Sequence, residues 1–158
     1  RPRSSVSNPL ITDHTTTSTK LSTRFLSFRH KYQLIRQKSR QALISDGSND
    51  IASLTMTKPV NNMNGQIVAN NITGLISGTI TNAVKYDENG IDLGSQTVWT
   101  GSDSAGVAAS DTCFDWSWSG GATSGQVGLS DQAGSTWLDN GVSACDQNNR
   151  FYCINIVR

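Results

Sequence analysis

The C-terminal sequence CDQNNRFYCINIV, residues 145–157, ends in a run whose side chains alternate as in a β-strand. Phe151, Cys153, Asn155 and Val157 share one face of such a strand, because successive residues point to opposite faces. Two cysteines eight positions apart lie in this sequence. Cysteines in a chain rich in tryptophan, glycine and turn residues indicate an oxidising compartment. The sequence therefore predicts a strand in a small, disulfide-containing domain.

Short strands and turns are also expected upstream of this run. Phe114, Trp116 and Trp118 alternate with polar residues, which predicts a strand with one aromatic face. The remaining expected elements are strands over 66–69 and 97–100, a helical turn or strand over 74–84, and turns at 61–65 and 87–90.

The composition of the chain changes near residue 42. Residues 1–41 hold nine Lys or Arg and one acid, a formal charge of +8, whereas residues 42–158 hold four Lys or Arg and eleven acids, a charge of −7. All 14 glycines, four tryptophans and three cysteines lie after residue 46. Residues 1–20 are rich in Ser and Thr, and we expect them to be a disordered tail. The chain starts at Arg1 without a hydrophobic leader, so a fragment or processed product is expected.

A basic amphipathic helix is predicted for residues 21–41, because apolar residues recur there at the spacing of one helix face. Such a helix packs on the domain that follows, or binds a membrane surface or a polyanion. A third hypothesis is that a frameshift or a wrongly joined gene places a foreign segment before Ala42. The apolar residues with helical spacing are Leu21, Phe25, Phe28, Tyr32 and Ile35.

A series of motifs in residues 42–158 resembles the C-type-lectin-like domains. The sequence VWTG at 98–101 matches their W-x-G strand, Cys113 follows it, and the last two cysteines stand eight positions apart. The nearer match is the bacterial, endostatin-like branch at the C terminus of collagen-like adhesins, whose linking segment resembles 67–71 and 87–90 here. The resemblance implies an α+β fold with short, mostly antiparallel strands, long loops and one or two helices.

The resemblance also implies how the cysteines pair. Cys113 and Cys145 are expected to form a disulfide, and Cys153 matches a cysteine that bonds to the first helix of the family. No cysteine precedes Cys113 in this sequence. Either the protein has lost that second bridge and keeps Cys153 as a buried thiol, or the residues before Ala42 are not native to the domain.

The resemblance implies that the chain binds carbohydrate or sulfated glycosaminoglycan in cell-surface adhesion, without catalysis. The family is associated with homotrimers below a collagen stalk, so a homotrimer that is secreted or exposed on a bacterial cell surface is expected. Sulfate recognition requires Arg and Lys, and we expect Lys58, Lys85 and Arg150 to bind the ligand. The alternatives are a structural domain that trimerises a collagen-like or fibrous surface protein, and a protein-binding module.

Enzyme chemistry, cofactors, metals and membrane insertion are not expected. The only histidines, His14 and His30, lie before residue 42, so a serine or cysteine nucleophile in the module has no histidine base. The sequence has no C-x-x-C zinc spacing, no phosphate-binding loop and no run of eighteen apolar residues. No proline follows Pro59, so the cis-proline loop of the calcium-dependent lectins is absent and sugar binding is expected to be calcium-independent. A nucleic-acid partner is not expected.

Two pairs of carboxylates and three tryptophans are interpreted as structural. Asp87 and Glu88 fit a solvated turn, and Asp111 and Asp115 fit the edge of a loop. A catalytic role is not expected for either pair, because general acid catalysis needs buried acids that perturb each other. Packing in the core is expected rather than sugar stacking for Trp116, Trp118 and Trp137.

Overall fold

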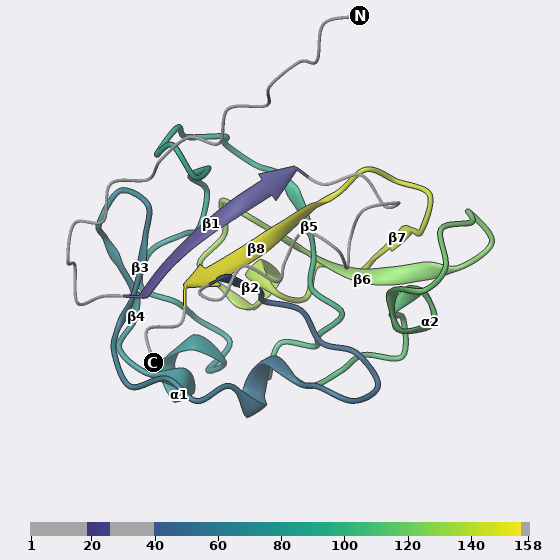
Figure 1. The fold of residues 1–158 in the computed structure, drawn as a ribbon, viewed down its shortest axis with the longest axis horizontal. Helices are drawn as coiled ribbons and strands as arrows, with labels where there is room; N and C mark the ends of the chain where they lie inside the picture. Colours follow the sequence, from purple (N-terminus) through teal and green to yellow (C-terminus); the bar gives the residue numbers. More distant parts are fainter. Residues whose placement is uncertain (1–18, 26–39, 156–158) are drawn as a thin grey trace, which may run out of the picture.

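Short strands dominate residues 19–25 and 40–155, the part of the chain that the computed structural model describes (Figure 1). Eight strands form one sheet, and the α-helices are single turns. In chain order the elements are β1 (Thr19–Phe25), β2 (Arg40–Ala42), β3 (Val60–Asn62), β4 (Ile67–Ala69), α1 (Ile72–Leu75), β5 (Thr97–Trp99), α2 (Cys113–Trp116), β6 (Ser124–Leu129), β7 (Val142–Ala144) and β8 (Arg150–Asn155), with 3-10 turns at Ile51–Ser53 and Ser135–Trp137.

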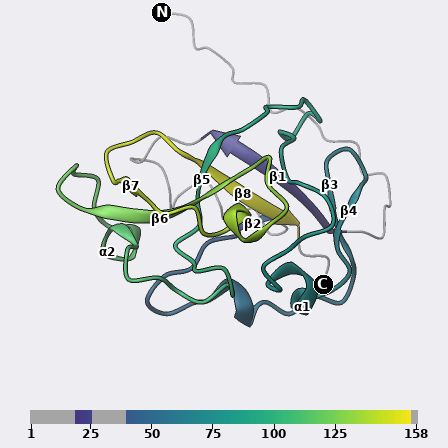
Figure 2. The same cartoon turned by 180° about the vertical axis from the view of Figure 1, so that it is seen from behind.

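The sheet has the strand order β4-β3-β1-β8-β5-β6-β7, and β2 pairs with β8 beyond the end of β5. Only β1 with β3 and β5 with β8 are parallel among the described pairs. The α2, β6 and β7 elements gather at one end of the molecule and α1, β3 and β4 at the other, as both views show (Figures 1 and 2). The mixed, mostly antiparallel architecture with few short helices is the one expected.

The helix predicted for residues 21–41 is wrong at both of its described ends. Thr19–Phe25 is strand β1, which pairs antiparallel with β8 over five residues, and Arg40–Ala42 is strand β2. Residues 26–39 and residues 1–18 of the expected tail lie outside the described residues. Leu21 and Phe25 are four positions apart, a spacing that puts both on one face of a strand as well as of a helix, so the sequence fits either. The hydrogen-bonding edge of β8 selects the strand.

The core lies on both sides of the central strands. Val98 and Tyr152 belong to a larger cluster with residues from β3, β4 and α1, whereas Trp99 and Phe151 belong to a smaller one that surrounds the disulfide. Consecutive residues enter different clusters because strand side chains alternate between faces. The strands predicted over 97–100 and 150–157 are thus confirmed over most of their lengths, and both faces of each strand are buried.

Three loops share one hydrogen-bonding pattern, at residues 62–66, 87–91 and 103–107. In each loop the first side chain, Asp or Asn, accepts hydrogen bonds from the amides two and four positions later. The fourth residue is a glycine with a positive φ of 75–81°, which suits the left-handed region that such a turn needs. These loops confirm the turns predicted at 61–65 and 87–90.

Candidate functional site

The α2 turn has an unusual backbone. Its four residues, Cys113–Trp116, have φ angles of 51–63°, so a left-handed turn stands where the aromatic alternation predicted a strand. That prediction is wrong. The left-handed conformation brings the Cβ of an L-residue close to the following carbonyl oxygen and costs about 1–2 kcal/mol per residue. Contacts with other segments must therefore hold α2 in this form.

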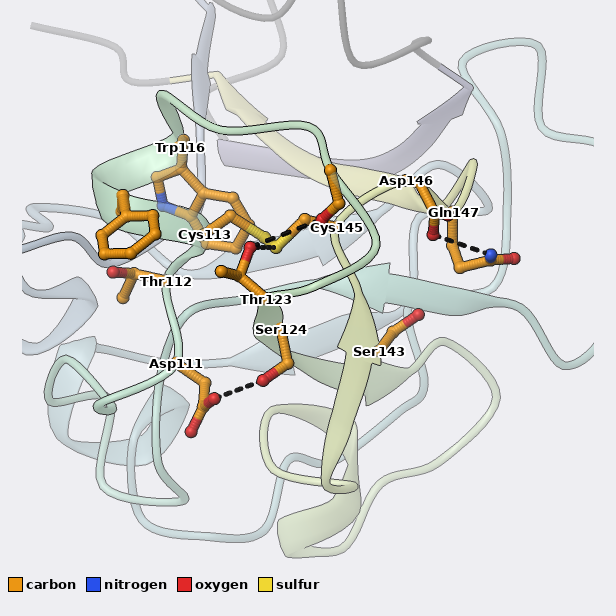
Figure 3. Close-up of a disulfide and its surroundings, with 12 residues drawn as sticks. Asp111, Thr112, Cys113, Trp116, Thr123, Ser124, Ser143, Cys145, Asp146 and Gln147 are labelled. Atoms are coloured by element: carbon orange, nitrogen blue, oxygen red, sulfur yellow. Dashed lines mark hydrogen bonds between the residues drawn. A yellow bond between two sulfur atoms is a disulfide. The ribbon is translucent and has the colours of Figure 1, made fainter.

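A disulfide ties the start of the turn to the residue that follows β7. Cys113 and Cys145 are bonded, with their Cα atoms 5.8 Å apart (Figure 3), as the resemblance implied. Gly125 of β6 packs against this bridge: a Cβ at that position would lie 2.8 Å from Sγ of Cys113 and 2.9 Å from the ring of Trp99. The close approach of β6 to the disulfide therefore depends on a glycine.

Trp116 anchors the other end of the turn. Its side chain is buried, its ring meets the edge of Trp99 with centroids 5.6 Å apart, and its indole Nε1 donates to the carbonyl oxygen of Ser45 at 2.9 Å. The core packing expected for Trp116 is confirmed. Burial of a large ring and a buried hydrogen bond offset part of the strain in the backbone.

Polar contacts hold the middle of the turn. Oγ1 of Thr112 accepts a hydrogen bond from the Asp115 amide at 3.2 Å, and the Asp115 carboxylate accepts from the Gly47 amide at 2.7 Å. A Cβ at Gly47 would lie 3.0 Å from that carboxylate. The turn Asp46-Gly47 and the α2 turn thus fit against each other, although 68 positions separate the two bonded residues.

The turn pushes two aromatic side chains into solvent. Phe114 is 67% exposed and Trp118 is 51% exposed, and their rings meet edge to face with centroids 6.4 Å apart. Trp118 also packs over Gly120, where a Cβ would lie 2.6 Å from its indole nitrogen. Core packing was expected for Trp118, and this expectation is wrong because the left-handed turn reverses the chain before residue 118. Trp137, by contrast, is fully buried as expected.

A shallow pocket of about 450 Å³ lies beside Phe114. One wall comes from α2 and the residues that lead into it, and the other comes from the start of β6 and the residues just before it. The Ser124 hydroxyl donates a hydrogen bond to the Asp111 carboxylate and so links the two walls (Figure 3). The lining residues are Ser110, Asp111, Thr112, Cys113, Phe114, Asp115, Ala122, Thr123 and Ser124.

The basic residues expected to bind the ligand lie elsewhere. The Lys85 ammonium forms an ion pair with Asp92 at 2.7 Å, which raises the pKa of Lys85 and lowers that of Asp92. Nε of Arg150 donates to Oε1 of Gln96 at 3.1 Å. Hydrogen bonds link these two groups, since Nε2 of Gln96 donates to the carbonyl of Leu93, whose amide donates to the carbonyl of Lys85. The structure thus brings Lys85 and Arg150 into one polar network.

This network and the pocket lie at opposite ends of β6. The Gln96 amide donates to Ser130 just after β6, whereas the pocket includes Ser124 at its start. Six strand residues separate the two ends by about 17 Å, at roughly 3.3 Å per residue. Lys58 lies two positions before β3, and β3 is at the other end of the molecule from α2 (Figure 1). The three predicted residues therefore do not form one patch with the pocket.

Sequence reasoning missed Phe114 as a candidate and interpreted Asp111 and Asp115 as a loop edge. The available signal was the sequence DTCFDW at 111–116, in which a bulky aromatic stands between a cysteine and an acid. Only the left-handed turn shows that the ring points outward.

Across residues 19–25 and 40–155, no cluster of three or more His, Cys, Asp or Glu is placed to hold a metal ion. The same residues contain no helix that is long and apolar enough to cross a membrane. No protein-family model matches the chain, and a search of curated proteins finds no relative of significant similarity.

Proposed function

We propose that this chain is a carbohydrate-binding module of the C-type-lectin-like class that binds its ligand, without catalysis, in the pocket beside α2. The observation that carries the proposal is Phe114: a bulky, 67% exposed ring on a strained turn that forms one wall of a polar pocket. Residues held in sparsely populated backbone regions cluster at functional sites. The same strained turn that buries Cys113 and Trp116 presents the ring of Phe114 to solvent, where it adds nothing to the core.

The combination of ring and pocket suits a sugar. The C–H groups of a pyranose carry partial positive charge and pack on the negative face of an aromatic ring. Its hydroxyls at the same time need polar partners, which Asp111, Asp115 and the wall hydroxyls supply. Binding sites of this kind combine apolar area with a few placed polar groups.

The disulfide and the W-x-G motif beside the pocket support the assignment to the C-type-lectin-like class. The Cys113–Cys145 bridge is the one that the resemblance implies, and the W-x-G motif places Trp99 in the core and Gly101 against Ser45. A disulfide persists in oxidising compartments, which supports a secreted or cell-surface location. We also propose a role in adhesion and assembly as a homotrimer. Light scattering of the full chain tests whether the homotrimer forms.

The test is a glycan array probed with the full chain and two variants. We expect the wild type to bind at least one glycan, and Phe114→Ala to lose that binding. Ile91→Ala is the matched control, because Ile91 is 58% exposed on the 87–91 loop and makes no part of the pocket; it should bind as the wild type does. Absence of binding by the wild type, or undiminished binding by Phe114→Ala, would contradict the proposal.

A further inference from the structure

Each hydroxyl group of the pocket wall donates a hydrogen bond to another group of the protein. Ser110 donates to Asp111 at 3.0 Å, and Ser124 donates to the other carboxylate oxygen of the same residue. Thr112 donates to Asp115 at 3.4 Å, and Thr123 donates to Sγ of Cys145 at 3.2 Å (Figure 3). A hydroxyl has one proton to donate and two lone pairs that accept. While these hydrogen bonds hold, the wall hydroxyls present lone pairs, and so hydrogen-bond acceptors, to a ligand.

The two carboxylates extend this bias. Asp111 and Asp115 line the pocket, and a carboxylate accepts hydrogen bonds but has no proton to donate. None of the nine described lining residues is Lys, Arg or His. The nearest part of β7 and its loop adds a further acid, since Asp146 lies against Gly121 next to the lining residue Ala122. The side chains of the site are thus rich in acceptors and in negative charge.

We infer that the pocket selects saccharides free of sulfate and carboxylate groups, and rejects sulfated glycosaminoglycans. The inference rests on the proposed function and names its ligand class. A sugar hydroxyl donates to an acceptor, and hydrogen bonds to an ionised acceptor are the stronger ones. A sulfate is itself only an acceptor, so it gains no hydrogen bond from these side chains and meets like charge at Asp111 and Asp115. Lys85 and Arg150, the two basic residues of the polar network, lie at the far end of β6, too far away to offset the repulsion between a sulfate and the two carboxylates.

The test is affinity electrophoresis of the full chain in native gels that contain a dissolved polysaccharide. Dextran, galactomannan, xyloglucan and laminarin are the uncharged probes, and heparin and chondroitin sulfate the sulfated ones. We expect at least one uncharged probe to retard the wild type, in a way that Phe114→Ala abolishes and added salt leaves unchanged, because no ion pair is screened.

Asp111→Asn tests the charge itself. The amide keeps an acceptor oxygen toward Ser124 but removes one negative charge from the pocket. The ratio of affinity for a sulfated probe to that for an uncharged probe should rise roughly threefold or more, the effect of one exposed charge at close range. Asp87→Asn, in the 87–91 loop, removes one charge outside the pocket and should leave the ratio unchanged. An unchanged ratio in Asp111→Asn would overturn the inference.

The outcomes separate the inference from the proposed function. Heparin retardation that Phe114→Ala abolishes would keep the pocket as the binding site and overturn its selectivity for uncharged sugars. Heparin retardation that survives Phe114→Ala arises elsewhere on the chain. In that case the inference stands if an uncharged probe retards the wild type but not Phe114→Ala, and it fails if no uncharged probe does. Retardation by sulfated probes alone overturns the inference, and failure of every probe and of the glycan array overturns the proposed function.

Discussion

Trp116 donates its indole N–H to the carbonyl oxygen of Ser45 at 2.9 Å, across 71 positions of the chain. Ser45 is itself held in place, since its amide donates to the carbonyl of Thr100 at 2.8 Å and its Oγ lies 2.6 Å from Oγ of Ser102. The same Ser45 carbonyl lies 2.3 Å from the position that a Cβ on Gly101 would occupy. One carbonyl group therefore joins the W-x-G motif to the left-handed turn that presents Phe114.

Replacement of Trp116 by Phe should destabilise the protein by about 2 kcal/mol. The change leaves the buried Ser45 carbonyl without the indole donor and opens a small cavity against Trp99. Urea denaturation followed by circular dichroism measures the loss. Trp118→Phe is the control and should cost less than about 0.5 kcal/mol, because Trp118 is half exposed. Equal losses in the two variants would show that the Ser45 contact does not stabilise the turn.

Gly101→Ala and Gly94→Ala separate backbone strain from steric clash. Both glycines have a φ of 61°, but a Cβ on Gly94 meets nothing within 4 Å, whereas one on Gly101 meets the Ser45 carbonyl at 2.3 Å. Gly94→Ala should cost about 1 kcal/mol, the penalty of the left-handed conformation. Gly101→Ala should cost roughly 2 kcal/mol more, because the backbone has to move. Similar midpoints of thermal unfolding in the two variants would contradict the close contact.

Loss of the disulfide should weaken the whole α2 region. The bridge closes a loop of 32 positions, and the double variant Cys113→Ser, Cys145→Ser should lose about 3–4 kcal/mol on the chain-entropy argument. Cys153→Ala keeps the bridge, and its expected cost is about 1 kcal/mol. Chemical denaturation compares them. A larger loss in Cys153→Ala than in the double variant would rule out the bridge as the main stabilising link.

The Cys153 thiol is buried and takes no part in the disulfide. We expect the native protein to resist a thiol reagent such as Ellman's reagent, because the sulfur is shielded from it. The protein denatured without a reductant should react at one thiol per chain, since the other two cysteines are bonded to each other. Rapid labelling of the native protein, or three reactive thiols after denaturation, would contradict this arrangement.

Tyr152 should make stability depend on alkaline pH. Burial raises the pKa of its hydroxyl far above the usual value, and the hydroxyl donates to the carbonyl of Trp137 at 3.1 Å. Because the folded pKa exceeds the unfolded one of about 10, the stabilisation is fully present below about pH 10 and is lost as the pH rises above it. Urea midpoints at about pH 9 and about pH 11 measure the fall, which Tyr152→Phe should reduce.

Tyr86→Phe is the control for this effect, because Tyr86 is only partly buried. That variant should keep the wild-type fall in stability between the two pH values. If Tyr152→Phe also keeps it, ionisation of Tyr152 does not contribute to alkaline unfolding.

Local patterns in the sequence are enough to predict the central part of this fold. The strand-favouring residues of 97–100 and 150–157 predict β5 and β8, because β-branched and aromatic side chains fit a pleated, buried surface. An Asp or Asn with a glycine three positions later predicts the 62–66 and 87–91 loops, because the acceptor side chain and the positive φ both act within five residues. The Cys113–Cys145 pairing follows from the resemblance to a family.

Contacts between distant segments decide the rest. Leu21 to Phe25 fits a helix or a strand by its apolar spacing, and the edge of β8, more than a hundred residues away, selects the strand. The alternation of Phe114, Trp116 and Trp118 predicts a strand, yet the disulfide and the Ser45 carbonyl impose a left-handed turn. A local pattern cannot predict such a turn, because its backbone is unfavourable in isolation and is stable only where tertiary contacts offset its strain. The exposed ring of Phe114, and with it the candidate site, exists for that reason.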